Sequence, residues 1–192
     1  MRREGSLVNV LLLRKKGWQE KESRVPYRGM RTFILLSAIP GSGKSTWAKQ
    51  YAKTHANTKI VSSDEIRLRE FGKVDDFSHE ADLWRMFLEE IHTDGKDEDV
   101  TVIADSTNIT NHYRQYYAEE TPEFDHKILV CFDLPFQIAL AQNNLRTGDR
   151  VVPQHVMESM HKDFEAPDET TLKMYDEYLL IDKDFIAEEL RK

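Results

Sequence analysis

The stretch that decides the fold is residues 33–46, which reads FILLSAIPGSGKST. The apolar run Phe33–Ser37 is typical of a buried strand, and Lys44–His55 has the mixed polar and apolar character of an amphipathic helix. Residues 38–43 join them as a glycine-rich turn. A strand, such a turn and a helix that opens with Lys-Ser is the context in which a P-loop binds phosphate, although Ala38 replaces the first glycine of the usual pattern.

The spacing within this turn has a physical reason. Glycines allow successive backbone N–H groups to turn inward around a phosphate, and the helix N-terminus adds its positive dipole. Lys44 is expected to reach the β- and γ-phosphates of ATP, and the Ser45 hydroxyl to bind magnesium. The cofactors predicted are therefore ATP and Mg²⁺. The nucleotide-binding residues predicted are Pro40, Gly41, Ser42, Gly43, Lys44, Ser45 and Thr46.

Beyond this motif, short apolar runs alternate with amphipathic segments, as in a parallel sheet covered by helices. The expected strands are Phe33–Ser37, Lys59–Ser62, Val100–Asp105, Lys127–Phe132 and Tyr178–Ile181. The expected helices are Lys44–His55, Ser78–His92, Asn111–Glu120, Phe136–Arg146 and Pro153–Phe164. This pattern predicts an α/β P-loop NTPase fold, with a doubly wound five-stranded parallel sheet and helices on both faces. Sheets of this kind bind ligands beyond the carboxyl ends of their strands.

Length and charge suggest one domain with a basic extension. A chain of 192 residues is the size of one α/β domain, here residues 30–192, and residues 1–29 lack a core-forming pattern. Residues 1–31 carry nine Lys or Arg against three Asp or Glu, so the rest of the chain has 18 basic and 31 acidic residues. Because an acidic surface repels a long polyanion, any nucleic-acid substrate is expected to bind end-on.

Other features indicate a cytoplasmic protein without a membrane span. The lone Cys131 excludes an internal disulfide framework, and is expected to be a core thiol. No apolar run approaches the roughly 20 residues that a transmembrane helix needs. The seven histidines show no metal-ligand spacing.

Three further sets of residues carry candidate chemistry. Asp64 follows the second strand, where a carboxylate can accept the proton of an attacking hydroxyl, and Arg67 can hold an anionic group of the acceptor. The alternative is that Ser62–Glu65 is only a capping box and Asp64 a favoured first-turn acid. Asp105 ends the third strand, as expected of an acid that organises the magnesium shell, whereas residues 106–108 suit a turn equally well.

The third set is a pair of arginines, Arg146 and Arg150, which flank a glycine-containing segment. Two guanidinium groups on such a segment can close over the transferring phosphoryl group and neutralise charge in its transition state. Each arginine taken singly is also consistent with a solvated surface residue. Near a P-loop, the pair predicts a lid.

These motifs resemble a known family. PGSGKSTWAKQ, residues 63–67, VIADSTN and CFDLPFQIALAQNNLRTGDRVVP are similar to the kinase domain of phage-type polynucleotide 5′-hydroxyl kinases and their relatives among small AAA-like P-loop kinases, over about residues 31–182. The resemblance implies that Lys44 and Ser45 bind ATP and magnesium and that Asp64 is the general base. It also implies that Arg67 binds the acceptor's phosphate and that Arg146 and Arg150 clamp the phosphates of ATP.

The sequence therefore predicts an ATP-dependent kinase that transfers a phosphoryl group to a hydroxyl, with a polynucleotide 5′-hydroxyl as the leading acceptor. A small-molecule kinase with the same ATP site is the first alternative, acting on a nucleoside, sugar, antibiotic or nucleotide-sugar. The second is an ATP-binding regulatory module without an acceptor. The acceptor and the oligomeric state are not determined by these motifs.

Overall fold

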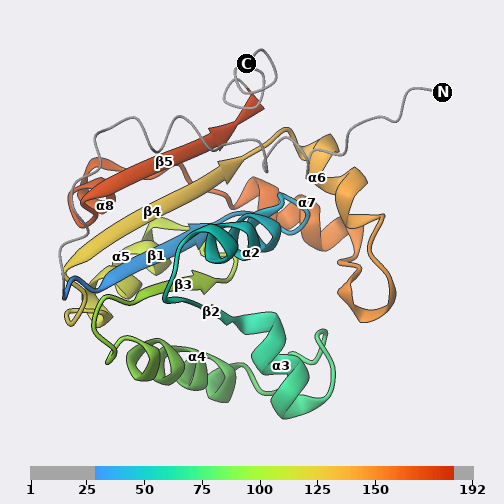
Figure 1. Cartoon of the computed structure of the whole chain (residues 1–192). Coiled ribbons are helices and arrows are strands. Elements are labelled where there is room, and N and C mark those ends of the chain that lie inside the picture. The colour runs from blue at the N-terminus through green and yellow to red at the C-terminus, as the bar shows by residue number, and fades with distance from the viewer. Residues whose placement is uncertain (1–28, 184–192) are drawn as a thin grey trace.

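The computed structural model describes residues 29–183, in which five parallel strands form one sheet in the order β2-β3-β1-β4-β5 (Figure 1). The strands are β1 Thr32–Ser37, β2 Thr58–Ser62, β3 Thr101–Asp105, β4 His126–Asp133 and β5 Glu177–Asp182. The predicted doubly wound parallel sheet is confirmed, with each strand within two residues of its expected bounds. Apart from Gly29, the predicted basic extension lies outside the described residues.

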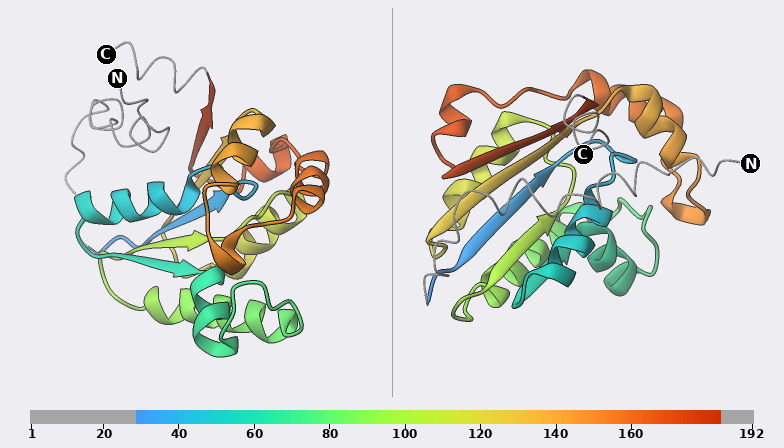
Figure 2. Two further views of the ribbon diagram at one scale, coloured as in Figure 1. Left: turned by 90° about the vertical axis from the view of Figure 1, so that its right-hand side faces the viewer. Right: turned by 45° about the horizontal axis from the view of Figure 1, so that its top comes forward.

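Helices cover both faces of the sheet, as predicted: α2 lies on one face, and α4 and α5 lie on the other (Figure 2). The helices are α2 Lys44–Thr54, α3 Ser63–Phe71, α4 Glu80–Asp94, α5 Asn111–Glu120, α6 Phe136–Asn143, α7 Gln154–Lys162 and α8 Glu169–Leu172, with a 3₁₀ helix, η1, at Gly148–Arg150. None of these helices, all within residues 29–183, is long and apolar enough to cross a bilayer.

Two helices differ from their predicted extents in ways that matter for the site. The helix expected over Phe136–Arg146 ends at Asn143, so Arg146 lies in a loop. The structure also adds α3 as a full helix of nine residues, directly after β2. Its mean hydropathy is low and its apolar side is short, so periodicity alone did not distinguish it from a capped turn.

The core forms two layers that β1 separates. Phe33 and Leu35 face the layer built with α4 and α5, whereas Ile34 and Leu36 face the layer built with α2, and all four side chains are fully buried. A central parallel strand is buried on both faces, which explains its continuous apolar sequence. Cys131 lies in the first layer, where burial raises the pKa of its thiol to about 11, so the predicted core thiol is confirmed.

Helix α4 ends at a glycine that a tertiary contact requires. Leu83, Phe87 and Ile91 form the buried stripe of the helix, and Gly95 follows as the C-cap. Its φ is −72°, which any residue adopts, so a positive φ does not explain the glycine. A Cβ at Gly95 would instead lie 2.5 Å from the ring of Phe124. The requirement is tertiary contact, which the sequence pattern alone did not reveal.

Strand register brings the polar ends of β2 and β3 together. Ser62 at the end of β2 pairs with Asp105 at the end of β3. The loop after β3 is attached to the start of the P-loop, because the Ala38 amide donates to the Thr107 carbonyl at 2.8 Å. Asn108, with a left-handed φ of 43°, donates from its side chain to the Leu36 carbonyl at 2.9 Å. Thr107 and Asn108 thus attach this turn to the start of the P-loop and to the end of β1.

Candidate active site

The P-loop has the backbone conformation that its sequence requires. Gly41 and Gly43 have φ values of 81° and 86°, in the left-handed region where L side chains are strained. Gly43 is the N-cap of α2 and Lys44 its first residue. Within the loop, the Ser42 hydroxyl donates to the Ile39 carbonyl at 2.9 Å. The loop therefore ends at a helix N-terminus, where free N–H groups and the helix dipole favour an anion.

Gly41 has a second role that the motif does not show. A Cβ at this position would lie 2.1 Å from the carbonyl oxygen of Ala139 and 3.2 Å from the Asn143 amide nitrogen. Helix α6 therefore packs directly on the backbone of the P-loop. Only a glycine permits this close approach, so the same residue shapes the phosphate cradle and positions α6 against it.

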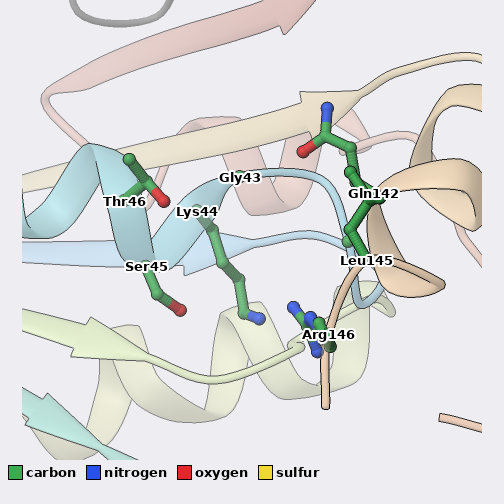
Figure 3. A pocket seen from close by; sticks show the side chains of 8 residues that line it. Gly43, Lys44, Ser45, Thr46, Gln142, Leu145 and Arg146 are labelled. Atoms are coloured by element: carbon green, nitrogen blue, oxygen red, sulfur yellow. The ribbon is translucent and has the colours of Figure 1, made fainter. Parts of the chain in front are cut away.

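A cavity of about 280 Å³ opens at this junction. The P-loop and α2 line one side, and the end of α6 and the following loop line the other (Figure 3). Figure 3 shows the side chains of Lys44 and Arg146 pointing toward one another, with Gln142 at the other end of the lining. The lining residues are Gly41, Gly43, Lys44, Ser45, Thr46, Gln142, Leu145 and Arg146.

Lys44 also faces the predicted metal-organising acid. Its Nζ lies 3.9 Å from Oδ1 of Asp105, and both side chains are almost completely buried. Oδ1 of Asp105 has no hydrogen-bond partner among the described residues. A buried carboxylate oxygen without a donor is costly unless a ligand or cation satisfies it. The Ser45 hydroxyl and Asp105 therefore fit a magnesium ion or its bound waters.

Magnesium would need phosphate oxygens to complete its shell here. Within residues 29–183, no three His, Cys, Asp or Glu side chains are grouped so that they could hold a metal. Mg²⁺ is commonly bound through one or two protein oxygens together with substrate phosphates and waters. The donor set matches a metal that arrives with a nucleotide rather than one bound by the protein alone.

Asp64 and Arg67 lie near one another on α3. Nη1 of Arg67 is 3.7 Å from Oδ1 of Asp64, and Nη2 donates to Oε1 of Glu80 at 2.7 Å. The other oxygen of Glu80 accepts from the Trp84 indole at 3.0 Å. Phe77 covers the guanidinium of Arg67, whose carbon lies 4.9 Å from the ring centroid. Arg67 is only 5% exposed, so it is fixed within the protein rather than open to solvent.

Ser62 caps α3, and Asp64 and Glu65 lie in the first turn of that helix, but the capping box is not complete. Ser62 is the N-cap of α3, and its hydroxyl accepts from the Glu65 amide at 3.5 Å. The Glu65 carboxylate does not complete a capping box but binds Nη2 of Arg150 at 2.9 Å. Asp64 is 43% exposed, and its carboxylate is free to meet a ligand on the side away from Arg67.

Residues 144–151 form the loop that the sequence predicts to act as a lid. Its base is closed by Asn143, which donates from Nδ2 to the Val152 carbonyl at 2.8 Å and accepts from the Val152 amide at 3.1 Å. Arg146 lies in the cavity, where burial lowers its pKa while the charges of Asp64 and Asp105 oppose that shift. The guanidinium of Arg146 thus interacts electrostatically with both Asp64 and Asp105.

Arg150 lies elsewhere in this structure. It pairs with Glu65 on α3, and both side chains are about half exposed. The adjacent Asp149 accepts from the Val74 amide at 3.0 Å, so the lid contacts the α3–α4 region at two points. The structure therefore brings Lys44, Ser45 and Arg146 together at the cavity. Arg150, in η1, does not line this cavity and pairs with Glu65 of α3 instead.

Several residues around the site had no signal in the sequence. The sequence pattern does not distinguish Gln142, Leu145 and Glu80 from solvent-exposed residues of the predicted helices. Arg114 is the extreme case, because it is fully buried and donates to the Ser37 hydroxyl at 3.1 Å and to the Ile109 carbonyl at 3.0 Å. Burial lowers its pKa. Only the packing of α5 against the site loops shows that this arginine is internal.

The fold and this site define the class of the domain. A doubly wound parallel sheet with a P-loop after its central strand, and with a lysine and an arginine lining one cavity, is a nucleotide-binding domain with a P-loop kinase-like fold. Residues 34–167 match the family described as AAA domain, and the chain belongs to that family.

Comparisons with characterised proteins agree with this class. The L-seryl-tRNA(Sec) kinase of Methanococcus maripaludis is 26% identical over 143 residues, covering 70% of this chain and 52% of the relative. A chain of the Pnkp1/Rnl/Hen1 complex is 27% identical, with a TM-score of 0.53, covering 59% of this chain and 39% of that one. The chain thus spans about half the length of the curated relative and less of the Pnkp1/Rnl/Hen1 chain.

More distant structures share the fold alone. A gluconokinase from Sinorhizobium meliloti is 18% identical, with a TM-score of 0.57, and the match covers 83% of this chain and 87% of that one. The relatives include kinases with different acceptors. The domain is therefore of the P-loop kinase type, and its acceptor is a separate question.

Proposed function

We propose that this protein transfers the terminal phosphoryl group of ATP to a hydroxyl, with a polynucleotide 5′-hydroxyl as the leading acceptor. The observation that carries the proposal is the meeting of Lys44 and Asp105, 3.9 Å apart, beside a cavity that Arg146 enters. Lys44 and Arg146 supply positive charge for phosphates, and Asp105 supplies an unsatisfied oxygen. A protein that only bound a nucleotide would not require Arg146 to interact electrostatically with both Asp64 and Asp105.

In this proposal the P-loop backbone and Lys44 hold the β- and γ-phosphates, and Arg146 neutralises charge that develops on the transferring group. Bound Mg²⁺ would supply positive charge that offsets the negative charge of the phosphates. Ser45 and Asp105 would hold the ion or its waters. These residues are arranged before the nucleotide arrives, so little reorganisation is needed at the moment of transfer.

The transfer step needs an acceptor for one proton. The acceptor oxygen attacks the γ-phosphorus, the bond from that phosphorus to the β–γ bridging oxygen breaks, and ADP leaves. Asp64 takes the proton from the acceptor hydroxyl. Arg67 contributes by fixing Asp64 through the contact at 3.7 Å, and Glu80 in turn fixes Arg67 at 2.7 Å. Arg67 is also the proposed contact for an acceptor phosphate, which would require Phe77 to move from its ring contact with Arg67.

The relatives favour an acceptor hydroxyl carried on nucleic acid. The curated relative is a kinase of L-seryl-tRNA(Sec), and the Pnkp1 structures belong to an RNA repair complex. Phe77 is 66% exposed beside Arg67 and offers an open ring face near Asp64. Bases at nucleic-acid ends stack on such rings. A small-molecule acceptor remains the alternative, because the gluconokinase from Sinorhizobium meliloti has the same fold.

A transfer screen with radiolabelled ATP and Mg²⁺ tests the proposal. The acceptors are 5′-hydroxyl RNA and DNA oligonucleotides, seryl-tRNA, nucleosides, gluconate and a nucleotide-sugar, with Lys44→Ala as the blank. We expect label on the 5′-hydroxyl oligonucleotide and none on the same oligonucleotide with a 5′-phosphate. Label on gluconate or a nucleoside alone would establish the small-molecule alternative. Tight ATP binding with no labelled acceptor would favour the regulatory module.

A further inference from the structure

A buried arginine lies behind the site and is bonded only to neutral groups in the described part of the chain. Arg114 of α5 is fully buried. Its guanidinium donates to a hydroxyl, to a side-chain amide oxygen and to a backbone carbonyl, and it makes no ion pair within residues 29–183. A buried charge that is not paired costs stability. The three hydrogen bonds are therefore the feature of this side chain that needs an explanation.

These bonds reach three segments of the chain. Nε of Arg114 donates at 3.1 Å to the hydroxyl of Ser37, the last residue of β1 before the P-loop. Nη2 donates at 3.0 Å to the carbonyl of Ile109, in the loop that follows Asp105, and Nη1 donates at 3.1 Å to Oδ1 of Asn111 in α5. The donors of a planar guanidinium point in fixed directions. Arg114 therefore forms a rigid bridge between the strand that leads into the P-loop and the loop that begins at Asp105.

The separation of these two segments sets the geometry of the proposed metal site. Ser45 lies in the first turn of α2, directly after the P-loop, whereas Asp105 is the last residue of β3. Because the two side chains come from different elements, their separation depends on tertiary contacts. Mg²⁺ tolerates little deviation from octahedral geometry. A small shift of the Asp105 loop relative to the P-loop would therefore weaken metal binding.

We propose that Arg114 is a positioning residue that holds Asp105 at the distance from the P-loop that magnesium requires when phosphates are bound. The inference rests on the proposed function and assigns a role in it to a residue outside the cavity lining. The P-loop has separate support, because α6 packs on the backbone of Gly41. Loss of the Arg114 bridge should therefore weaken the metal contact and leave the phosphate contacts of Lys44 and the P-loop backbone intact.

Arg114→Met removes the bridge without leaving its acceptors unpaired. The Ser37 hydroxyl still donates to the Asn108 carbonyl at 2.8 Å. The Ile109 carbonyl still accepts from the Glu165 amide at 2.9 Å, and the third acceptor keeps a threonine hydroxyl at 3.0 Å. Replacement of a buried charged group by an apolar one of similar volume is often neutral or stabilising. The variant is therefore expected to fold.

Isothermal titration calorimetry on the full chain tests the proposal without requiring an acceptor. ATP is titrated at a series of Mg²⁺ concentrations and in EDTA. Arg114→Met should need about 10-fold more Mg²⁺ for half-maximal ATP binding, the lower end of what loss of an outer-shell partner costs in metal affinity. Its ATP affinity in EDTA should equal that of the wild type. Arg114→Lys keeps the charge but not the planar fork, and should show a smaller rise in the Mg²⁺ requirement.

Tyr175→Phe is the matched control. The Tyr175 hydroxyl donates to the backbone carbonyl of Arg114 at 2.6 Å, so this variant loses a buried hydrogen bond at the same residue but keeps the bridge. It should lower the melting midpoint and leave the Mg²⁺ requirement unchanged. An equal rise in the Mg²⁺ requirement of Tyr175→Phe would show a general loosening of α5 and overturn the inference.

A wild-type Mg²⁺ requirement in folded Arg114→Met would also overturn the inference while leaving the proposed function intact. So would a loss of ATP affinity in EDTA as large as the loss with Mg²⁺. If thermal melting shows that Arg114→Met fails to fold, the same criteria apply to Arg114→Lys. A wild type that binds no ATP, or binds it equally with and without Mg²⁺, would overturn the inference and the proposed function together.

Discussion

The two halves of the candidate site are built differently. On the nucleotide side, Lys44 begins α2 and Asp105 ends β3, and their side chains are 10% and 5% exposed. On the acceptor and lid side, Arg150 and Glu65 meet across the surface with 43% and 54% exposure. The first pair is enclosed by the sheet and the P-loop. The second pair joins a loop to a helix that solvent reaches freely.

This difference predicts which half can rearrange. A solvent-exposed ion pair contributes about 0–1 kcal/mol, so the contact between Arg150 and Glu65 is easily exchanged for a contact with a phosphate. Buried polar groups are strongly dependent on their partners, and the nucleotide side therefore stays in one arrangement. The molecule combines a preorganised nucleotide half with a lid half that can change partners. The following changes test that division.

Lys44→Ala should have the largest effect, because the lysine neutralises phosphate charge in both the ground state and the transition state. We expect transfer to fall below detection and ATP affinity to fall as well. The control is Lys49→Ala, an exposed lysine on the same helix, which should retain wild-type activity. Transfer rates and ATP titration measure both effects. Full activity in folded Lys44→Ala protein would contradict the whole interpretation of the cavity.

Asp64→Asn should lower the transfer rate by about 10²- to 10⁴-fold with nearly unchanged ATP affinity, because proton acceptance matters only as the hydroxyl attacks. The fold should survive, since Ser62 rather than Asp64 caps α3. Steady-state transfer, ATP titration and thermal melting provide the comparison. Near-normal turnover in Asp64→Asn would show that Asp64 is only a first-turn acid of α3 and not the general base.

Gly41→Ala should destabilise the nucleotide half more than Gly72→Ala destabilises α3. The two glycines have nearly the same φ, 81° and 80°, so the cost of a left-handed alanine, about 1–2 kcal/mol, is common to both. Only Gly41 also places a Cβ against the backbone of α6, which adds roughly 1–3 kcal/mol of overpacking. Thermal melting should show a lower midpoint for Gly41→Ala. Equal midpoints would mean that α6 moves away without cost.

Glu65→Gln should have the smallest effect, because it removes one exposed ion pair from the lid. Releasing Arg150 toward the phosphates should tighten ATP binding by up to about 5-fold, in line with the 0–1 kcal/mol of such pairs. The gain should shrink at high salt, as exposed charges are screened. ATP titration at low and high salt measures it. Weaker ATP binding in this variant would show that Glu65 supports the lid instead of restraining it.

Local sequence predicted the nucleotide half closely. The strands β1 and β3, the P-loop and the N-terminus of α2 each have a local cause in apolar runs, glycines and a helix start. Asp105 was assigned as the acid at the end of an apolar strand, and the structure places it 3.9 Å from Lys44. Such positions follow from the chain's own periodicity, because parallel strands bring their carboxyl ends to one edge.

The lid half was predicted only in part. Arg146 reaches the cavity, but from a loop, because α6 ends at Asn143, whose side chain bonds to Val152. Arg150 pairs with Glu65, 85 residues away in sequence, and no local pattern specifies that contact. Arg67 was predicted to hold an anionic group of the acceptor, and its contacts with Phe77 and Glu80 were not foreseen. Each difference comes from a contact between segments that are distant along the chain.

The sequence by itself determined the class of fold, the phosphate cradle and the positions of the acids that follow β2 and end β3, since these depend on residue types at fixed local spacing. Tertiary structure alone decided the partners of Arg67, Arg114 and Arg150. It also explains Gly41, beside the backbone of α6, and Gly95, beside the ring of Phe124, because a Cβ at either position would clash. The physical reason is that periodicity fixes which side of an element is buried. Only the packed chain fixes what that side meets.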